Sequence, residues 1–258
     1  NVYTIYSKRR MIIMARRFIL NEKDIVSEND NCIKIVGNEV KHIQVLRHNI
    51  GDEIVINEYI CKITEMGREY ITLEKIAISP KIGEPKINVT LYMAMLKGDK
   101  MDLVIQKAVE LGVKNIVPFI SKNVVVKLDD KSKQKKKEKF QKQADEACKQ
   151  CGRSDKVLVE DILEFTDIFD KISNEKIVIF AYEKEENKTL KDILSTCDTF
   201  NVKDISVIVG AEGGFTEGEA DSLKYTENVE CVSLGSRILR AETAAINLLS
   251  IIMYELDK

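Results

Sequence analysis

The sequence predicts an α/β protein whose C-terminal two thirds form a parallel sheet, with a small all-β domain before it. From residue 89 onward, short apolar runs alternate with stretches in which apolar residues recur at helical spacing. This pattern is typical of a parallel sheet with helices on both faces. Before residue 79 the apolar runs are about five residues long and lie between polar turns, which favours a β-barrel or sandwich. The intervening segment Ser79–Pro85 holds two of the three prolines and is predicted to be a linker.

The first domain is expected to span residues 14–82. Its predicted strands are 18–20, 32–36, 53–56, 59–63 and 70–73. A helix is predicted over 39–48, because Val40, Ile43 and Leu46 recur at helical spacing. Residues 1–13 are interpreted as an extension, since the run that starts at Met14 resembles a natural beginning.

The second domain is expected to span residues 86–258. Its predicted strands are 89–95, 115–120, 176–182, 205–209 and 230–234. After the first of them, one face of a predicted helix carries Met101, Val104, Ile105, Ala108 and Leu111, and Gly112 ends that helix.

Composition excludes several classes of protein. With 44% apolar and 32% charged residues among 258, the chain has the make-up of a soluble globular protein. No apolar run approaches the roughly 20 residues that a membrane helix needs. Six scattered cysteines without a recognisable signal peptide favour a reduced, cytoplasmic setting. A net charge of −2 argues against a protein that coats polyanions indiscriminately, so any RNA contact is expected to be a local patch.

Two glycine-rich segments, 207–216 and 231–243, each follow a predicted strand. Glycine permits positive φ and close approach of the backbone to a ligand. In parallel sheets, ligands bind at the carboxyl ends of the strands, so we expect the two segments to lie at neighbouring strand ends and to form one site. Neither segment has the spacing of a dinucleotide-binding loop or of a P-loop.

Five segments in this order resemble the RsmE family, the 16S ribosomal RNA uracil-N3 methyltransferases of the SPOUT superfamily. They are residues 95–102, 106–112, 147–153, 210–214 and 234–243. The resemblance implies a PUA-like RNA-binding barrel, a methyltransferase domain with a trefoil knot, S-adenosylmethionine as cofactor, a homodimer and the small ribosomal subunit as partner. One departure is Ala211, where the family usually has proline. Without that proline, the loop is expected to be more mobile.

The resemblance also implies which residues hold the cofactor. They come from the end of the strand over 176–182 and from the two glycine-rich segments: Tyr182, Gly210, Glu212, Gly213, Gly214, Leu234, Gly235, Ile238 and Leu239. Glu212 has a second interpretation, as a carboxylate that favours the positive end of a helix. Thr216 and Glu219 have the spacing of a capping box and are assigned to structure.

Arg240 and Glu242 are the candidate catalytic residues. The N3 atom of uracil belongs to an imide whose proton must leave, and a guanidinium can stabilise the charge that develops on the flanking carbonyl oxygens. Glu242 could accept the proton or orient Arg240. The alternative is that Glu242 is a helix-start residue with Arg240 as its ion-pair partner.

Basic residues supply the candidate RNA contacts. The resemblance implies Arg16, Arg17, Lys41, Arg47 and Arg153. The segment 131–142 holds seven lysines and one glutamate, which fits either a solvated helix face or contact with phosphates.

The pair Cys148 and Cys151 is expected to lie in the core with no metal, because no second cysteine pair or nearby histidine completes a zinc site.

Two further functions remain open from the sequence. A knotted methyltransferase could act on another RNA base or on ribose, and a non-catalytic RNA-binding protein could share the fold. The intact Arg240, Glu242 and glycine set argues against the second, because a protein that only binds RNA has no need for them.

Overall fold

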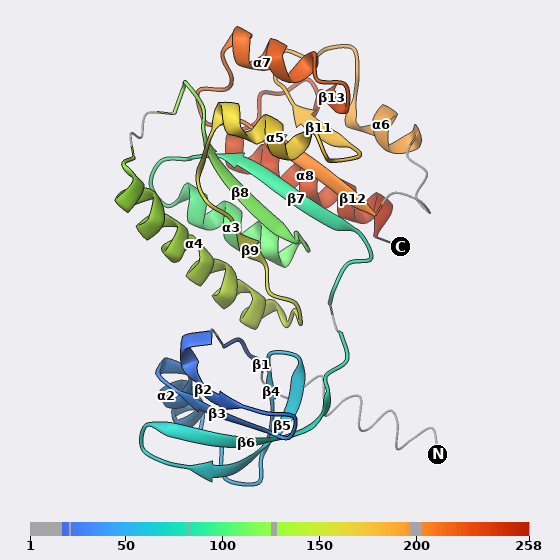
Figure 1. Cartoon of the computed structure of the whole chain (residues 1–258). Coiled ribbons are helices and arrows are strands. Elements are labelled where there is room, and N and C mark those ends of the chain that lie inside the picture. Colours follow the sequence, from blue (N-terminus) through green and yellow to red (C-terminus); the bar gives the residue numbers. More distant parts are fainter. Residues whose placement is uncertain (1–16, 21, 82, 125–127, 197–202, 258) are drawn as a thin grey trace. The chain divides into compact units, whose positions relative to one another are not determined.

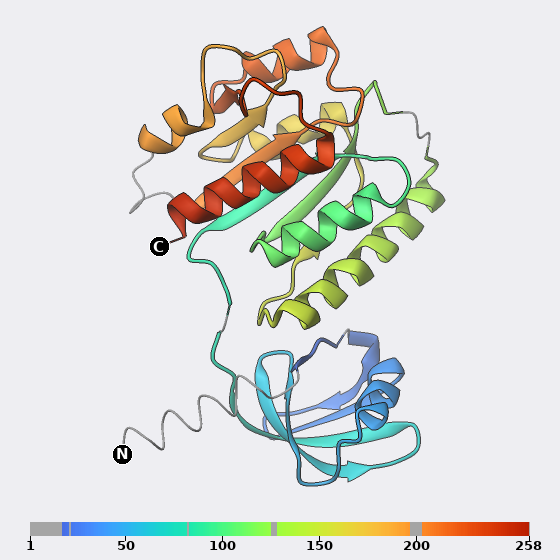
Figure 2. The same cartoon turned by 180° about the vertical axis from the view of Figure 1, so that it is seen from behind.

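The chain forms two compact units, which Figures 1 and 2 show from opposite sides. This computed structural model describes residues 17–20, 22–81, 83–124, 128–196 and 203–257. The first unit comprises residues 1–84 together with 149–156, and the second comprises residues 85–148 and 157–258. The predicted extension 1–13 lies outside the described residues. The return of residues 149–156 to the first unit is a feature that the sequence analysis did not predict.

The first unit is built on a six-stranded sheet in the order β1-β4-β5-β6-β3-β2. Its strands are β1 (Arg17–Phe18), β2 (Ile25–Glu28), β3 (Cys32–Val36), β4 (Glu53–Ile56), β5 (Tyr59–Met66) and β6 (Tyr70–Ile78), with the 3-10 helix η1 (Glu22–Asp24) and helix α2 (Asn38–Val45). All neighbours pair antiparallel except β1 and β4, which are parallel. Every second residue of β3 is buried, as Ile33 and Ile35 show, so one face of the sheet covers the core.

The second unit is built on a seven-stranded sheet in which every pairing is parallel. Its path is β10-β8-β7-β12-β11-β13, with β9 paired to β8. The strands are β7 (Asn88–Ala94), β8 (Asn115–Ile120), β9 (Leu158–Val159), β10 (Leu163–Glu164), β11 (Val178–Ala181), β12 (Asp204–Val209) and β13 (Val229–Val232). The predicted α/β class with a parallel sheet is therefore confirmed.

Helices cover both faces of this sheet. They are α3 (Lys100–Glu110), α4 (Asp130–Cys151), α5 (Ile168–Ile172), α6 (Leu190–Thr196), α7 (Glu217–Lys224) and α8 (Ala241–Leu256), with the 3-10 helix η2 (Phe165–Asp167). Both views show α3 and α8 side by side on one face and α5 on the other (Figures 1 and 2). The α8 helix buries Leu248, Leu249 and Ile252 against the sheet side. None of the helices in the described part of the chain is long and apolar enough to cross a membrane.

The strand order corrects one sequence-based expectation. The two glycine-rich segments follow β12 and β13, but these strands are not neighbours, because β11 pairs with both and lies between them. The end of β11 therefore lies between the two glycine-rich segments. Parallel strands can be connected in several spatial orders, so the sequence alone does not reveal this intervening strand.

Both Cys148 and Cys151 were expected to lie in the core, and this is wrong for Cys151. Cys148 is fully buried on α4, whereas Cys151 is exposed. Cys151 is the last residue of the helix, and Gly152 follows it with a φ of +78°. The chain leaves the helix at this left-handed glycine, so the pattern of buried positions does not continue to Cys151.

The predicted capping box of α7 is confirmed and reaches further than expected. The Thr216 hydroxyl accepts a hydrogen bond from the Glu219 backbone N–H, and Glu219 Oε2 accepts one from the Thr216 N–H at 2.9 Å. Glu219 Oε1 also accepts from the Lys122 N–H at 2.8 Å. Glu219 is 3% exposed, and its carboxylate joins the segment after β8 to the start of α7.

We expect Glu219→Ala to lower the free energy of unfolding by about 2–4 kcal/mol, because the partly buried hydrogen bonds from the N–H groups of Thr216 and Lys122 lose their charged acceptor. Urea unfolding followed by circular dichroism measures the effect. The control is Glu217→Ala on the same helix, where an exposed side chain is removed and the change should stay within about 0.5 kcal/mol. Equal effects of the two substitutions would contradict this role for Glu219.

Candidate functional site

The carboxyl ends of β11, β12 and β13 surround a cavity of about 640 Å³. Three chain segments line it: residues 181–183 at the end of β11, 209–215 after β12, and 233–241 before and into α8. Lys100, the first residue of α3, also lines it. A cavity at this edge of a parallel sheet has the usual position and size of a small-molecule site.

The structure brings together all of the residues predicted to bind a cofactor. The cavity is lined by Tyr182, Gly210, Glu212, Gly213, Gly214, Leu234, Gly235, Ile238 and Leu239, and also by the candidate catalytic residue Arg240. Glu242 does not line the cavity but lies near Lys100, which does.

The loop after β12 is held from two sides by neighbouring segments. Asn123 donates a hydrogen bond from Nδ2 to the carbonyl of Gly213 at 2.9 Å and approaches that of Gly214 at 3.3 Å. Gly214 has a φ of +63°, and a Cβ there would lie 2.7 Å from Glu183 Oε1. The left-handed backbone favours glycine at position 214, and any larger residue would also displace the flexible end of the Glu183 side chain.

The segment after β13 presents backbone and apolar surface. Gly235 has a φ of +115°, and a Cβ added there would meet no atom within 4 Å. Its N–H donates to Ser233 Oγ at 3.3 Å. Ile238 is 86% exposed. An exposed apolar side chain among backbone donors is the mixture that small-molecule sites combine.

Glu212 is fixed by residues that precede and begin α3. Its Oε1 accepts from Lys100 Nζ at 3.1 Å and from the Lys97 N–H at 3.3 Å. Burial acts to raise the pKa of Glu212, but its own backbone N–H, the Lys100 ammonium and the Lys97 N–H outweigh this and lower the pKa. Glu212 therefore ties the loop to α3, rather than only favouring a helix N-terminus.

The candidate catalytic residues are not partners of each other. Arg240 is the N-cap residue of α8 and is exposed, whereas Glu242 is largely buried in the first turn. Within the described residues, the cation found within 4.0 Å of the Glu242 carboxylate is Lys100, not Arg240. Glu242 Oε2 has no hydrogen-bond partner among those residues. The alternative interpretation, in which Arg240 is the ion-pair partner of Glu242, is therefore not found among the described residues, where Lys100 approaches Glu242 instead.

Sequence reasoning missed three charged residues that line the cavity: Lys100, Glu183 and Arg237. Lys100 and Arg237 belong to segments 95–102 and 234–243, which carried the family resemblance, so a signal was present. Glu183 directly follows β11, and its place at the cavity depends on a strand order that the sequence does not show.

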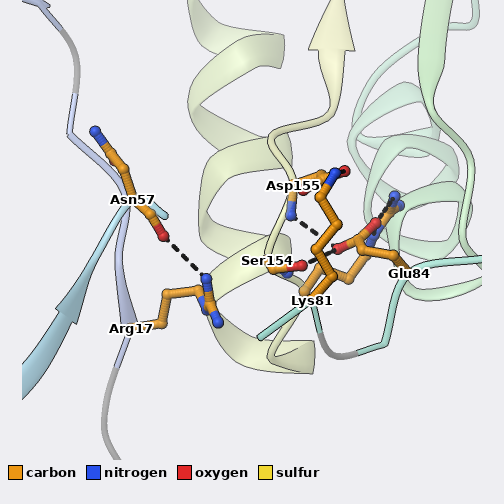
Figure 3. Close-up of polar contacts among 7 residues, drawn as sticks. Arg17, Asn57, Lys81, Glu84, Ser154 and Asp155 are labelled. Atoms are coloured by element: carbon orange, nitrogen blue, oxygen red, sulfur yellow. Dashed lines mark hydrogen bonds and ion pairs between the residues drawn. The ribbon is translucent and has the colours of Figure 1, made fainter. Parts of the chain in front are cut away.

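The predicted RNA contacts that the structure describes belong to the first unit, whereas the cavity belongs to the second. Lys41 and Arg47 are exposed in and after α2. Arg17 donates from its guanidinium to the carbonyl of Asn57 at 2.9 Å, as Figure 3 shows, and to Ser79 Oγ at 3.0 Å. Arg16 lies outside the described residues.

Arg153 has a buried position in the first unit. It is 4% exposed, and its Nη2 donates to Glu84 Oε2 at 2.8 Å. The other oxygen of Glu84 accepts from the N–H groups of Ser154 and Asp155 at 2.7 and 2.8 Å, as Figure 3 shows. These contacts join residue 84 to the segment that follows α4.

Three lysines of the run 131–142 form ion pairs within the second unit. Lys133 pairs with Glu164, Lys137 with Asp161 and Lys139 with Asp102. The exposed lysines of the run include Lys131, Lys135 and Lys142. Across the described ranges, no group of three histidine, cysteine, aspartate or glutamate side chains is placed to hold a metal ion.

A family model described as RNA methyltransferase domain matches residues 83–253. Ribosomal RNA small subunit methyltransferase E of Bacillus subtilis (strain 168) is 33% identical over 252 residues, which cover 95% of this chain and 98% of that protein. The protein of the same name from Rickettsia conorii is 30% identical, with 89% and 91% covered.

Solved structures give the same result. The crystal structure of a ribosomal RNA small subunit methyltransferase E from Neisseria gonorrhoeae, bound to S-adenosyl methionine, has a TM-score of 0.78 and 27% identity, with 93% of this chain and 97% of that chain covered. A putative methyltransferase of Legionella pneumophila in complex with the same cofactor has a TM-score of 0.78, 26% identity and the same coverage. These matches confirm the SPOUT-type α/β fold.

The matched family model and the relatives that align over nearly the whole chain lead to one conclusion: the chain belongs to the RNA methyltransferases of the RsmE family.

Proposed function

We propose that the protein transfers a methyl group from S-adenosylmethionine to N3 of a specific uridine in the 16S rRNA of the small ribosomal subunit. The observation that carries the proposal is the cavity at the ends of β11, β12 and β13, where all nine residues expected to hold the cofactor meet Arg240. The relatives named for small-subunit rRNA methylation and the neighbours solved with this cofactor support it.

The residues present fit S-adenosylmethionine. A volume of about 640 Å³ lies within the usual range for a cofactor site. Gly235 presents its backbone with no atom within 4 Å of the position that a Cβ would take, so a ligand can approach the chain there. Leu234, Ile238 and Leu239 offer apolar contact beside those backbone groups. When bound, the cofactor supplies a methyl group on a sulfonium.

The chain's own residues would act on the acceptor base. Arg240, exposed among the residues that line the cavity, can stabilise the negative charge that develops on the carbonyl oxygens beside N3. Glu242 keeps its proposed role as acceptor of the N3 proton, since its Oε2 has no hydrogen-bond partner among the described residues; because this oxygen is buried and does not line the cavity, the role requires the base or an intervening water to come within hydrogen-bond reach of it. Orientation of Arg240 by Glu242 is not part of this proposal, because Lys100 is the nearby cation.

Several finer features belong to the same proposal. We assign residues 14–82 to a PUA-like RNA-binding barrel, supported by the six-stranded antiparallel-rich sheet, and residues 86–258 to the methyltransferase domain. A trefoil knot in the second unit is part of the proposal from the family resemblance, and the order β12-β11-β13, in which the chain passes β11 between β12 and β13, is consistent with it. Exposed Lys41 and Arg47 are the proposed rRNA contacts, in a cytoplasmic homodimer.

We predict that the protein transfers labelled methyl groups from S-adenosylmethionine to small ribosomal subunits that lack 3-methyluridine. Nucleoside chromatography should place the label in 3-methyluridine. Label in another base or in ribose would keep a methyltransferase and overturn the acceptor. Cofactor binding without any label would favour a protein that only binds RNA.

Within that assay, Arg240→Ala should lower kcat about 100-fold or more, because the charge on the carbonyl oxygens loses its stabilising cation. Calorimetry should give an unchanged Kd for S-adenosylmethionine, since the cofactor is expected to contact the backbone of this segment. Near-normal kcat in the variant would remove Arg240 from the mechanism.

A second substitution tests whether the backbone at Gly235 contacts the cofactor. Gly235→Ala should weaken S-adenosylmethionine binding about tenfold, because the added Cβ would occupy the open space by which a ligand approaches this backbone, and because the free loop would relax from a φ of +115°, which strains a residue with a Cβ by about 1–3 kcal/mol. Gly218→Ala is the matched control: its Cβ also meets no atom within 4 Å, but it lies in α7 without positive φ and outside the cavity. Equal Kd values of Gly235→Ala and Gly218→Ala for S-adenosylmethionine would contradict a cofactor contact at Gly235.

A further inference from the structure

Lys100 lies where three separate parts of the second unit meet. It is the first residue of α3, and its ammonium group contacts Glu212 of the loop after β12 at 3.1 Å. The same Nζ is 4.0 Å from Oε2 of Glu242 in the first turn of α8. One side chain thus approaches carboxylates from two segments that line or adjoin the cavity.

The negative charges of Glu212 and Glu242 need a nearby cation to offset their repulsion. Besides Lys100, the charged side chains that line the cavity are Glu183 from the end of β11, Glu212, and Arg237 and Arg240 from the segment before α8. Within the described residues, the ion pairs formed by Glu212 and by Glu242 are both with Lys100. Two carboxylates that share one cation repel each other when that cation is removed.

Burial adds to this requirement. The Glu242 side chain is 13% exposed, and its Oε2 is buried with no hydrogen-bond partner among the described residues. A buried carboxylate oxygen is costly unless a charge or a donor compensates for it. The hydrogen bond from Lys100 is also one of the contacts that lower the pKa of Glu212.

We propose that Lys100 is a positioning residue of the methyl-transfer site, whose ammonium group holds the Glu212 loop against α3 and fixes the Glu242 carboxylate beside it. This inference rests on the proposed function and adds to it a residue outside the two glycine-rich segments. Lys100 acts through the two glutamates: it keeps the cofactor loop and the proton-accepting carboxylate in one arrangement.

The test compares Lys100→Met with Lys100→Arg and with Lys107→Met. Methionine keeps most of the length of the side chain without the charge, and arginine keeps the charge. Lys107 lies on the same helix, pairs with Glu110 at 2.8 Å, and does not line the cavity, so it is the matched control. Thermal unfolding shows which variants fold.

The first readout is kinetic. Lys100→Met should lower kcat about tenfold or more, which corresponds to about 1.4 kcal/mol, and should weaken S-adenosylmethionine binding. Lys100→Arg should restore most of both quantities, and Lys107→Met should change neither. Full kcat and cofactor affinity in folded Lys100→Met would overturn the proposal. So would a loss in folded Lys100→Arg as large as in the methionine variant.

The second readout does not need turnover. Carbon-13 NMR of labelled glutamate, assigned with Glu212→Gln, measures the pKa of Glu212. In the wild type this pKa is lowered, so the pair with Lys100 is formed at neutral pH and is lost as the pH falls through that pKa. In Lys100→Met the pKa of Glu212 should rise toward the ordinary glutamate range, and in Lys100→Arg it should stay low.

An unchanged Glu212 titration in Lys100→Met would overturn the proposal even if the enzyme were active. The opposite result is also informative. If the wild type transfers no methyl group but the pKa of Glu212 rises in Lys100→Met as expected, the proposed function is wrong and the ion pair is established. The two hypotheses can therefore fail separately.

Discussion

The parallel pairing of β7, β12, β11 and β13 is the constraint on which the site depends. In a parallel sheet all strands point the same way, so the loops that follow them emerge at one edge. Val207 and its neighbour Ile208 are both fully buried on opposite faces of the sheet, so packing on both faces holds the pairing of β12 with β11. The register is thereby fixed, and with it the positions of the loops. Segments that are far apart in the sequence can then line one cavity.

Local features of the fold followed from the sequence, because they depend on neighbouring residues. Apolar runs marked the buried strands β7, β8 and β12, and the spacing of Thr216 and Glu219 marked the start of α7. Glycines marked the loops of the cavity. Each of these signals lies within a few residues of the structure that it specifies.

Features that depend on residues far apart in the sequence were not predicted. The position of β11 between β12 and β13 depends on the path of the chain, so Glu183, which follows β11, was left out of the predicted site. The suggested partnership of Arg240 and Glu242 failed for a geometric reason. Residues two apart at the start of a helix do not face each other, whereas a residue of the packed neighbouring helix can approach either one.

The contacts of Glu84 have a consequence for synthesis on the ribosome. Its carboxylate accepts hydrogen bonds from Arg153 and the two residues after it, and these donors follow 69 or more residues later in the chain. At the usual speed of translation, roughly 3–14 s separate the synthesis of the acceptor from that of its donors. The N-terminal sheet thus emerges well before its last segment, which arrives only after β7, α3 and β8 have been made. A nascent chain halted between these points, or a fragment ending at residue 84, carries a carboxylate whose donors do not yet exist.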